Sequence, residues 1–343
     1  MSAGNPIPNE MGAEDFRRAL AKLVPRMAGL VTFSGGEPLL APFCLDLAEW
    51  VRGEFGVPMN LITNATQIDC EAKAARIAAS FQEVQVSIDG ATPAVFERTR
   101  GPGSFEPMRN GLRLLAQQDI AELAVAICLL PWNLDDLFDN LVPFLEEVDP
   151  NRRITSVRVS DTIQFGRADG SMSVRLTAEQ DARFSEMQHR IAATGRRNWT
   201  RADDDAREHH FRFNKGRSRQ LKGSCGFGDG LILDSNGDLY PCPMMKRGAR
   251  LTSVLAPEAD ALLGAQLRSA FQRHHVDQIV PCKSCEIRYL CRGGCRVENA
   301  RASGSTEVVD CTPAHKAERV ARVGDEIRQR YSSMVRHSLR VLQ

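Results

Sequence analysis

The residues with the clearest chemical potential in this sequence are its cysteines. The chain has ten of them, and seven lie after residue 224. These seven are Cys225, Cys242, a C-x2-C-x5-C-x3-C run from Cys282 to Cys295, and Cys311. Two residues between cysteines allow neighbouring thiolates to reach one metal centre, and four thiolates complete a zinc site or an iron–sulfur cluster. Seven thiols exceed one such site and fall one short of two.

A zinc ribbon on Cys282, Cys285, Cys291 and Cys295 is the simplest alternative use of these thiols. A disulfide framework is disfavoured, because the N-terminal sequence MSAGNPIPNE has neither the basic start nor the apolar core of a secretion signal. In a reducing compartment, clustered thiols are metal ligands more often than disulfides. The pattern therefore favours a metal centre.

A second candidate site is the turn Ser34-Gly35-Gly36-Glu37-Pro38, which follows a short apolar run. Glycines at the end of a strand let the backbone approach a ligand closely, and a glutamate can pair with a cationic amine. The alternative is an ordinary strand–helix turn with an exposed glutamate.

The first two hundred residues alternate between apolar, strand-like runs and helical patterns. Repeated strand–helix units with apolar strands predict a parallel sheet covered by helices, with the ligand site at the carboxyl ends of the strands. The expected strands are 30–33, 59–62, 84–88, 123–130 and 154–159, and the expected helices are 14–27, 43–54, 70–80, 105–117, 134–148 and 178–193.

Beyond this region the pattern changes, and we expect a domain at 1–195, a polar linker at 196–222 and a cysteine-rich domain at 223–343. In the last of these, Ser235-Asn236-Gly237 separates two apolar runs, and Asn-Gly is typical of a hairpin turn. Short helices and cysteine-bearing loops follow, closed by a charged helix near 313–335.

Composition excludes several classes of protein. The 343 residues are 43% hydrophobic and 25% charged, with 44 Lys plus Arg against 43 Asp plus Glu. A balanced charge gives no general attraction to nucleic acid or to an acidic membrane. The longest apolar run, 123–130, is far short of the roughly 20 residues that a membrane helix needs. We therefore expect a cytoplasmic globular protein with no nucleic acid and no membrane as partner.

The cysteine spacing resembles the SPASM domain, the C-terminal extension of many radical S-adenosylmethionine (SAM) enzymes. That resemblance implies two auxiliary 4Fe–4S clusters with interleaved ligands. One set would be Cys282, Cys285, Cys291 and Cys311, and the other would be Cys225, Cys242 and Cys295, with its fourth position unassigned.

The turn at Gly35, Gly36, Glu37 and Pro38 then resembles the radical SAM motif that binds the amino group of SAM. The stretches 60–64, 86–90, 100–105 and 166–167 fit the same family, which implies that Ser87 and Asp89 lie near the nucleoside end of SAM. The implied fold is α/β, a partial (β/α)6 radical SAM barrel lacking its first strand, followed by a small α+β SPASM domain.

The sequence departs from the family in one respect. It contains no C-x3-C-x2-C, the loop whose cluster cleaves SAM, and we interpret Cys44, Cys70 and Cys128 as ordinary buried thiols. Either the chain is incomplete at its N-terminus, or it is a degenerate member that does not cleave SAM. We favour the first, because Glu37 and its glycines are retained.

The resemblance implies a radical SAM oxidoreductase that modifies a peptide or protein side chain after hydrogen abstraction by a 5′-deoxyadenosyl radical. Its partners would be that substrate and an electron donor such as flavodoxin or ferredoxin, and the SAM-cleaving 4Fe–4S cluster would be present only with an upstream segment. The alternative is an iron–sulfur electron-transfer or peptide-binding partner protein that does not cleave SAM.

Overall fold

The computed structural model divides the chain into two compact units, Met1–Arg217 and Ser218–Gln343. Within them the structure describes residues 9–27, 29–161, 177–195, 197–199, 230–243, 250–256, 264–265, 269, 272–309, 311–314, 316–317 and 320–321.

The first unit is built on a six-stranded sheet in which strand order follows chain order. Every neighbouring pair is parallel, so each strand is followed by a crossover that returns the chain to the same end of the sheet. The strands are β1 (Val31–Phe33), β2 (Met59–Thr63), β3 (Glu83–Ser87), β4 (Glu122–Leu129), β5 (Ile154–Asp161) and β6 (Arg197–Trp199). The predicted α/β fold with a partial barrel is confirmed.

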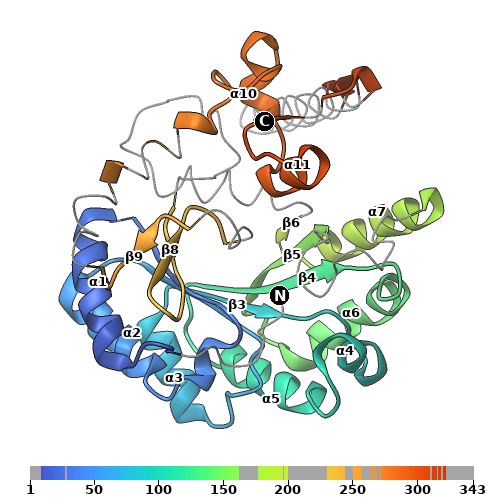
Figure 1. The fold of residues 1–343 in the computed structure, drawn as a ribbon. Coiled ribbons are helices and arrows are strands. Elements are labelled where there is room, and N and C mark those ends of the chain that lie inside the picture. Colours follow the sequence, from blue (N-terminus) through green and yellow to red (C-terminus); the bar gives the residue numbers. More distant parts are fainter. Residues whose placement is uncertain are drawn as a thin grey trace, which may run out of the picture. The chain divides into compact units, whose positions relative to one another are not determined.

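Figure 1 shows the sheet curving, with helices along its outer side. The six predicted helices are present, and α4 is an addition that the apolar pattern did not indicate. The helices are α1 (Ala13–Met27), α2 (Cys44–Phe55), α3 (Glu71–Ser80), α4 (Pro93–Arg100), α5 (Phe105–Ala116), α6 (Leu134–Val148) and α7 (Ala178–Ala193), with a short 3-10 turn η1 (Pro38–Leu40) after β1.

Strand β6 corrects one boundary. Residues 197–199 lie in the segment predicted as a linker, yet they pair in parallel with β5 through Ser156–Arg197, Val157–Asn198 and Arg158–Trp199. A three-residue polar strand carries no periodicity of its own, and its place is set by the hydrogen-bonding edge of β5. The rest of the predicted linker, 200–222, lies outside the described residues.

The two faces of the sheet differ in polarity because successive side chains point to opposite sides of a strand. Residues such as Leu61, Val84, Val125 and Val157 are buried in the core between sheet and helices. The other face carries polar side chains, among them Glu83 and Arg158.

A buried ion cluster ties three strands together, joining the first residues of β3 and β4 to Arg158 in the middle of β5. Arg158 on β5 donates to Glu83 at 2.5 Å, to Glu122 at 2.9 Å and to Gln85 at 2.8 Å. Arg158 and Glu83 are less than a tenth exposed, so the two carboxylates depend on this guanidinium for compensation.

The packing of α5 gives a testable stability difference between two helical glycines. A Cβ at Gly111 would collide with the carbonyl oxygen of Ala65, whereas a Cβ at Gly53 on α2 would meet nothing within 4 Å. Gly111→Ala should therefore destabilise the fold by about 1–3 kcal/mol. Gly53→Ala should stabilise it by up to about 1 kcal/mol through helix propensity. Urea unfolding of both variants checks this; equal effects would contradict the close approach.

The second unit contains a small antiparallel sheet and a cysteine-bearing helical segment. Its hairpin turns at Ser235–Gly237 as predicted, and a third strand pairs with the second. The elements are β7 (Ile232–Leu233), β8 (Asp238–Tyr240), β9 (Thr252–Ser253), η3 (Cys282–Ser284), α10 (Arg288–Cys291) and α11 (Arg296–Ser303). Of the expected closing helix at 313–335, the described residues 313–314, 316–317 and 320–321 are helical. No helix in the described part of the chain combines the length and the apolar character that a membrane span requires.

Candidate functional site

The first candidate site lies where β1 and β2 end. After Phe33 the chain enters an exposed turn in which Gly35 has a φ of 139°, a value that favours glycine. Ser34, Gly35 and Gly36 are all exposed, so their backbone is accessible to a ligand. Pro38 then starts the 3-10 turn η1 in its preferred first position, and Glu37 caps that turn.

The Glu37 carboxylate is held by donors from two elements. Its Oε1 accepts hydrogen bonds from the Thr63 hydroxyl at 2.7 Å and from the Leu39 N–H at 3.2 Å, and its Oε2 accepts one from the Asn64 N–H at 2.6 Å. The pKa of Glu37 is raised, because burial outweighs the opposing effect of these hydrogen bonds. Glu37 is thus fixed in position at the sheet edge.

A carboxylate offers about four lone-pair sites. Three of them are used in Glu37, and the remaining one is on Oε2. A single further donor, such as an ammonium group, can therefore be accepted without disturbing the turn. This arrangement suits a residue that orients one cationic group of a ligand.

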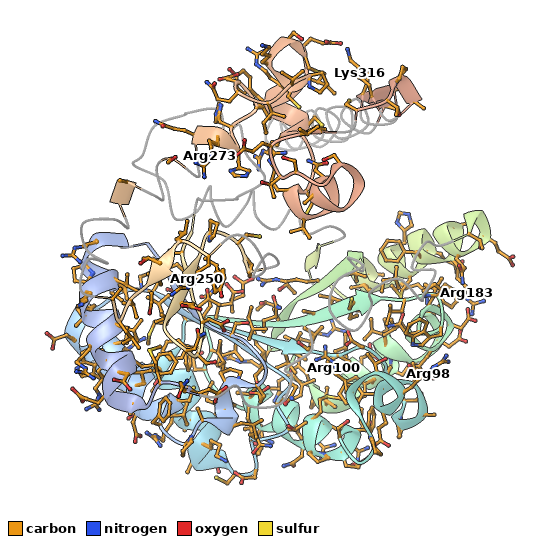
Figure 2. The ribbon with its side chains drawn as sticks, in the orientation of Figure 1. Arg98, Arg100, Arg183, Arg250, Arg273 and Lys316 are labelled. Atoms are coloured by element: carbon orange, nitrogen blue, oxygen red, sulfur yellow. The ribbon has the colours of Figure 1, made fainter. Side chains whose placement is uncertain are left out.

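Asp89, the other predicted acidic contact, is committed to the protein itself. The residue is 2% exposed, and its Oδ1 accepts from the Cys128 N–H at 2.9 Å. Its Oδ2 accepts from Arg100 Nε at 2.7 Å and Nη2 at 2.6 Å. Arg100 is the last residue of α4 (Figure 2). Asp89 therefore anchors α4 to the ends of β3 and β4.

Arg100 also connects the two acids electrostatically, since its charge lowers the pKa of Glu37 against the dominant effect of burial. Ser87 is the last residue of β3 and is half-buried. The sequence indicated Glu37, Ser87 and Asp89 but did not identify Arg100 as the link. The carboxyl ends of neighbouring parallel strands lie close together, and this rule could have suggested that a basic residue near Asp89 also faces Glu37.

The sequence predicted that all three isolated cysteines are buried, and the structure shows that they are not. Cys44 is buried, Cys128 is intermediate, and Cys70 is exposed at the N-cap of α3. Burial raises the pKa of the Cys44 thiol to about 12, with a smaller contribution from Glu37. The prediction is wrong for Cys70 because the residue precedes its helix on the solvent side.

The second candidate site is a pocket in the C-terminal unit. Four cysteines line it, namely Cys282, Cys285, Cys291 and Cys311, and we call it the four-cysteine pocket. These are the residues assigned to one auxiliary cluster by the SPASM resemblance. Cys295, which the zinc-ribbon alternative requires, is not among the residues lining it.

The lining of the pocket combines four thiols with the cationic side chains of Arg288 and Lys316. Burial raises the pKa of Cys282 to about 11, and the neighbouring thiols of Cys285, Cys291 and Cys311 act in the same direction, while Arg296 opposes them. Among the described residues, no three His, Cys, Asp or Glu side chains are placed to hold a single metal ion. The four thiols line one pocket, which suits a group with several thiolate ligands.

The remaining three predicted ligands are less completely described. Cys242 follows β8 and Cys295 is the N-cap of α11, both at intermediate exposure. Cys225 lies outside the described residues. Their shared cluster stays a prediction.

Comparison with known proteins gives three relevant similarities. The model of the radical SAM superfamily matches residues 2–141. Mycofactocin maturase MftC of Mycobacterium ulcerans (strain Agy99) is 26% identical over 303 residues, which cover 86% of this chain and 77% of that protein. Native anSMEcpe with bound AdoMet has a TM-score of 0.65 at 18% identity, covering 94% of this chain and 89% of that one. Streptococcus suis SuiB bound to precursor peptide SuiA has a TM-score of 0.66 at 15% identity, covering 90% of this chain and 70% of that one.

Residues 2–141 thus form a radical SAM domain. The chain as a whole has the fold of the two structures just described, and its C-terminal part carries the cysteine-rich region. SAM and 4Fe–4S clusters are the cofactors of this family.

Proposed function

We propose that this protein is a radical SAM/SPASM maturase that modifies a peptide or protein side chain. The observation that supports this most strongly is that one chain contains both a Gly-Gly-Glu-Pro turn at the sheet edge of the first unit and a four-cysteine pocket in the second unit. Similarity to a mycofactocin maturase over most of both chains supports the same class of substrate.

In this proposal SAM is held at the carboxyl ends of β1, β2 and β3. Gly35, Gly36 and Pro38 shape the turn that approaches it, and the remaining acceptor site of Glu37 receives its ammonium group. Ser87 offers a hydroxyl close to the nucleoside end. Asp89 contributes through Arg100, by fixing the wall of the site. In the maturase proposal, SAM bound together with a SAM-cleaving cluster would supply the radical that abstracts hydrogen.

Two auxiliary 4Fe–4S clusters are proposed for the second unit. Cys282, Cys285, Cys291 and Cys311 would hold one, and their shared pocket supports the assignment. Cys225, Cys242 and Cys295 would hold the other. Because clusters of this kind exchange electrons, we include an oxidoreductase role and an electron donor such as flavodoxin or ferredoxin.

The cluster that cleaves SAM does not fit the residues present. The 343 residues contain no C-x3-C-x2-C, and Cys44, Cys70 and Cys128 lie at the start of α2, the cap of α3 and the end of β4, on three separate elements. No cleavage step is therefore assigned to these residues. This supports a second candidate function, a partner protein that carries clusters or peptide without cleaving SAM.

SAM binding separates the two candidates. The maturase proposal predicts weak binding by this chain, and Glu37→Ala should reduce the affinity at least about tenfold, because an ammonium group loses a charge-assisted hydrogen bond. Isothermal titration calorimetry at millimolar SAM measures this.

Glu54→Ala is the matched control, since Glu54 is an exposed glutamate on α2. It should leave the affinity unchanged, and circular dichroism should show both variants folded. Equal affinity of Glu37→Ala and the parent chain would remove Glu37 from the site. Absence of SAM binding by the parent chain would favour the partner protein instead.

A further inference from the structure

Arg296 is a fully buried cation without a carboxylate partner in the part of the chain that the structure describes. Its exposed fraction is 0%. Its guanidinium donates only to backbone carbonyls, those of His274 at 2.8 Å, Gly293 at 3.0 Å, Arg292 at 3.2 Å and Gly294 at 3.3 Å. Its Nε is buried and has no hydrogen-bond partner. Burying an unpaired charge is costly, and carbonyl dipoles offset only part of the cost.

The location of this cation adds to the cost. Arg296 is the first residue of α11, where the positive end of the helix dipole disfavours a cation. Two cations line the four-cysteine pocket, and each has a carboxylate partner: Arg288 pairs with Asp277 at 2.9 Å and Lys316 pairs with Glu286 at 2.9 Å. Arg296 differs from these two cations, because its hydrogen bonds within the described residues go to backbone carbonyls and to no carboxylate.

The position of Gly293 locates the guanidinium relative to the pocket. A Cβ on Gly293 would lie 2.8 Å from Arg296 Nη1 and 3.3 Å from Cys282 Sγ, so these two atoms are no more than about 6 Å apart. At this distance, and away from solvent, two unit charges interact strongly. A negatively charged group bound in the pocket would therefore be close enough to compensate the charge of Arg296.

We propose that Arg296 is a positioning residue that balances the charge of an iron–sulfur cluster in the four-cysteine pocket and raises its reduction potential. The proposal rests on the cluster assigned above. A 4Fe–4S centre with four thiolates carries two negative charges when oxidised and three after accepting one electron. A fixed positive charge stabilises the reduced form more than the oxidised form, so the potential rises.

The test is a redox titration of the reconstituted full chain, with dithionite as electron source and electron paramagnetic resonance as readout. The signal of this cluster is the one that Cys285→Ala abolishes. Arg296→Gln should keep its iron and shift the midpoint potential of that signal to a more negative value. Arg296→Lys keeps the charge and should stay close to the parent. Arg273→Gln is the control, because Arg273 is 57% exposed and paired with Glu307 (Figure 2).

Each outcome decides the matter. An unchanged potential in an iron-replete Arg296→Gln variant overturns the proposal and leaves the proposed cofactors intact. A shift of equal size in Arg273→Gln also overturns it, because general charge would then be the cause. If Arg296→Gln loses its iron, the Arg296→Lys variant is compared with it. Iron loss in Arg296→Lys as well would mean that Arg296 only maintains the structure of the loop, and the proposal would be wrong. A parent chain that takes up no iron refutes the cofactor assignment itself, together with this inference.

Discussion

Substituting Cys285 by alanine should remove about half of the iron from the reconstituted chain. Two four-iron clusters predict about eight irons and eight sulfides per parent chain. Cys285 lines the four-cysteine pocket with Cys282, Cys291 and Cys311, so its loss removes one ligand of that cluster and none of the other proposed set, Cys225, Cys242 and Cys295. Iron and acid-labile sulfide assays after anaerobic reconstitution measure the change.

A second variant sharpens this prediction. Cys295 belongs to the other proposed cluster, so Cys295→Ala should also remove about half of the iron, and the double variant should lose nearly all of it. A zinc ribbon on Cys282, Cys285, Cys291 and Cys295 predicts complete metal loss from each single variant instead. Cys70→Ala is the control, because Cys70 is an exposed thiol on α3 in the other unit. Stoichiometric zinc without sulfide would refute the cluster assignment.

The strands could be predicted because each buried strand of a parallel sheet is a short apolar run. Segments such as 84–88 and 123–130 are apolar enough to stand out without their neighbours. In the first unit, one helix and one strand were missed, for opposite reasons. Helix α4 has a single buried residue, Phe96, among several charged side chains, and β6 exists only because β5 offers an unpaired edge.

In the candidate sites, the local sequence motifs could be predicted, whereas the contacts between distant segments could not. The turn at Gly35–Pro38 and the run from Cys282 to Cys291 are local patterns, and their chemistry follows from residue types at fixed spacing. The donors to Glu37 come from Thr63 and Asn64, which become its neighbours only when β1 and β2 pair. Likewise, the contact of Arg100 with Asp89 depends on how α4 packs.

The chain as it stands should not cleave SAM to 5′-deoxyadenosine, even with excess dithionite. The ligands of the SAM-cleaving cluster are not among its 343 residues, and the seven cysteines after residue 224 are assigned to other clusters. Fusing a C-x3-C-x2-C segment ahead of Glu10 should produce cleavage where there was none and should tighten SAM binding, because the added iron would chelate the amino and carboxylate groups. Liquid chromatography of 5′-deoxyadenosine measures the gain. The same fusion with its three cysteines changed to alanine is the control and should stay inactive.

Adding Glu37→Ala to the active fusion should weaken SAM binding again, since the ammonium group would lose its acceptor at the sheet edge. Cleavage by the unfused chain would show that other cysteines do this work. A fusion that holds its extra iron yet neither binds nor cleaves SAM would favour the partner protein, because the turn at Glu37 would then be a structural cap alone.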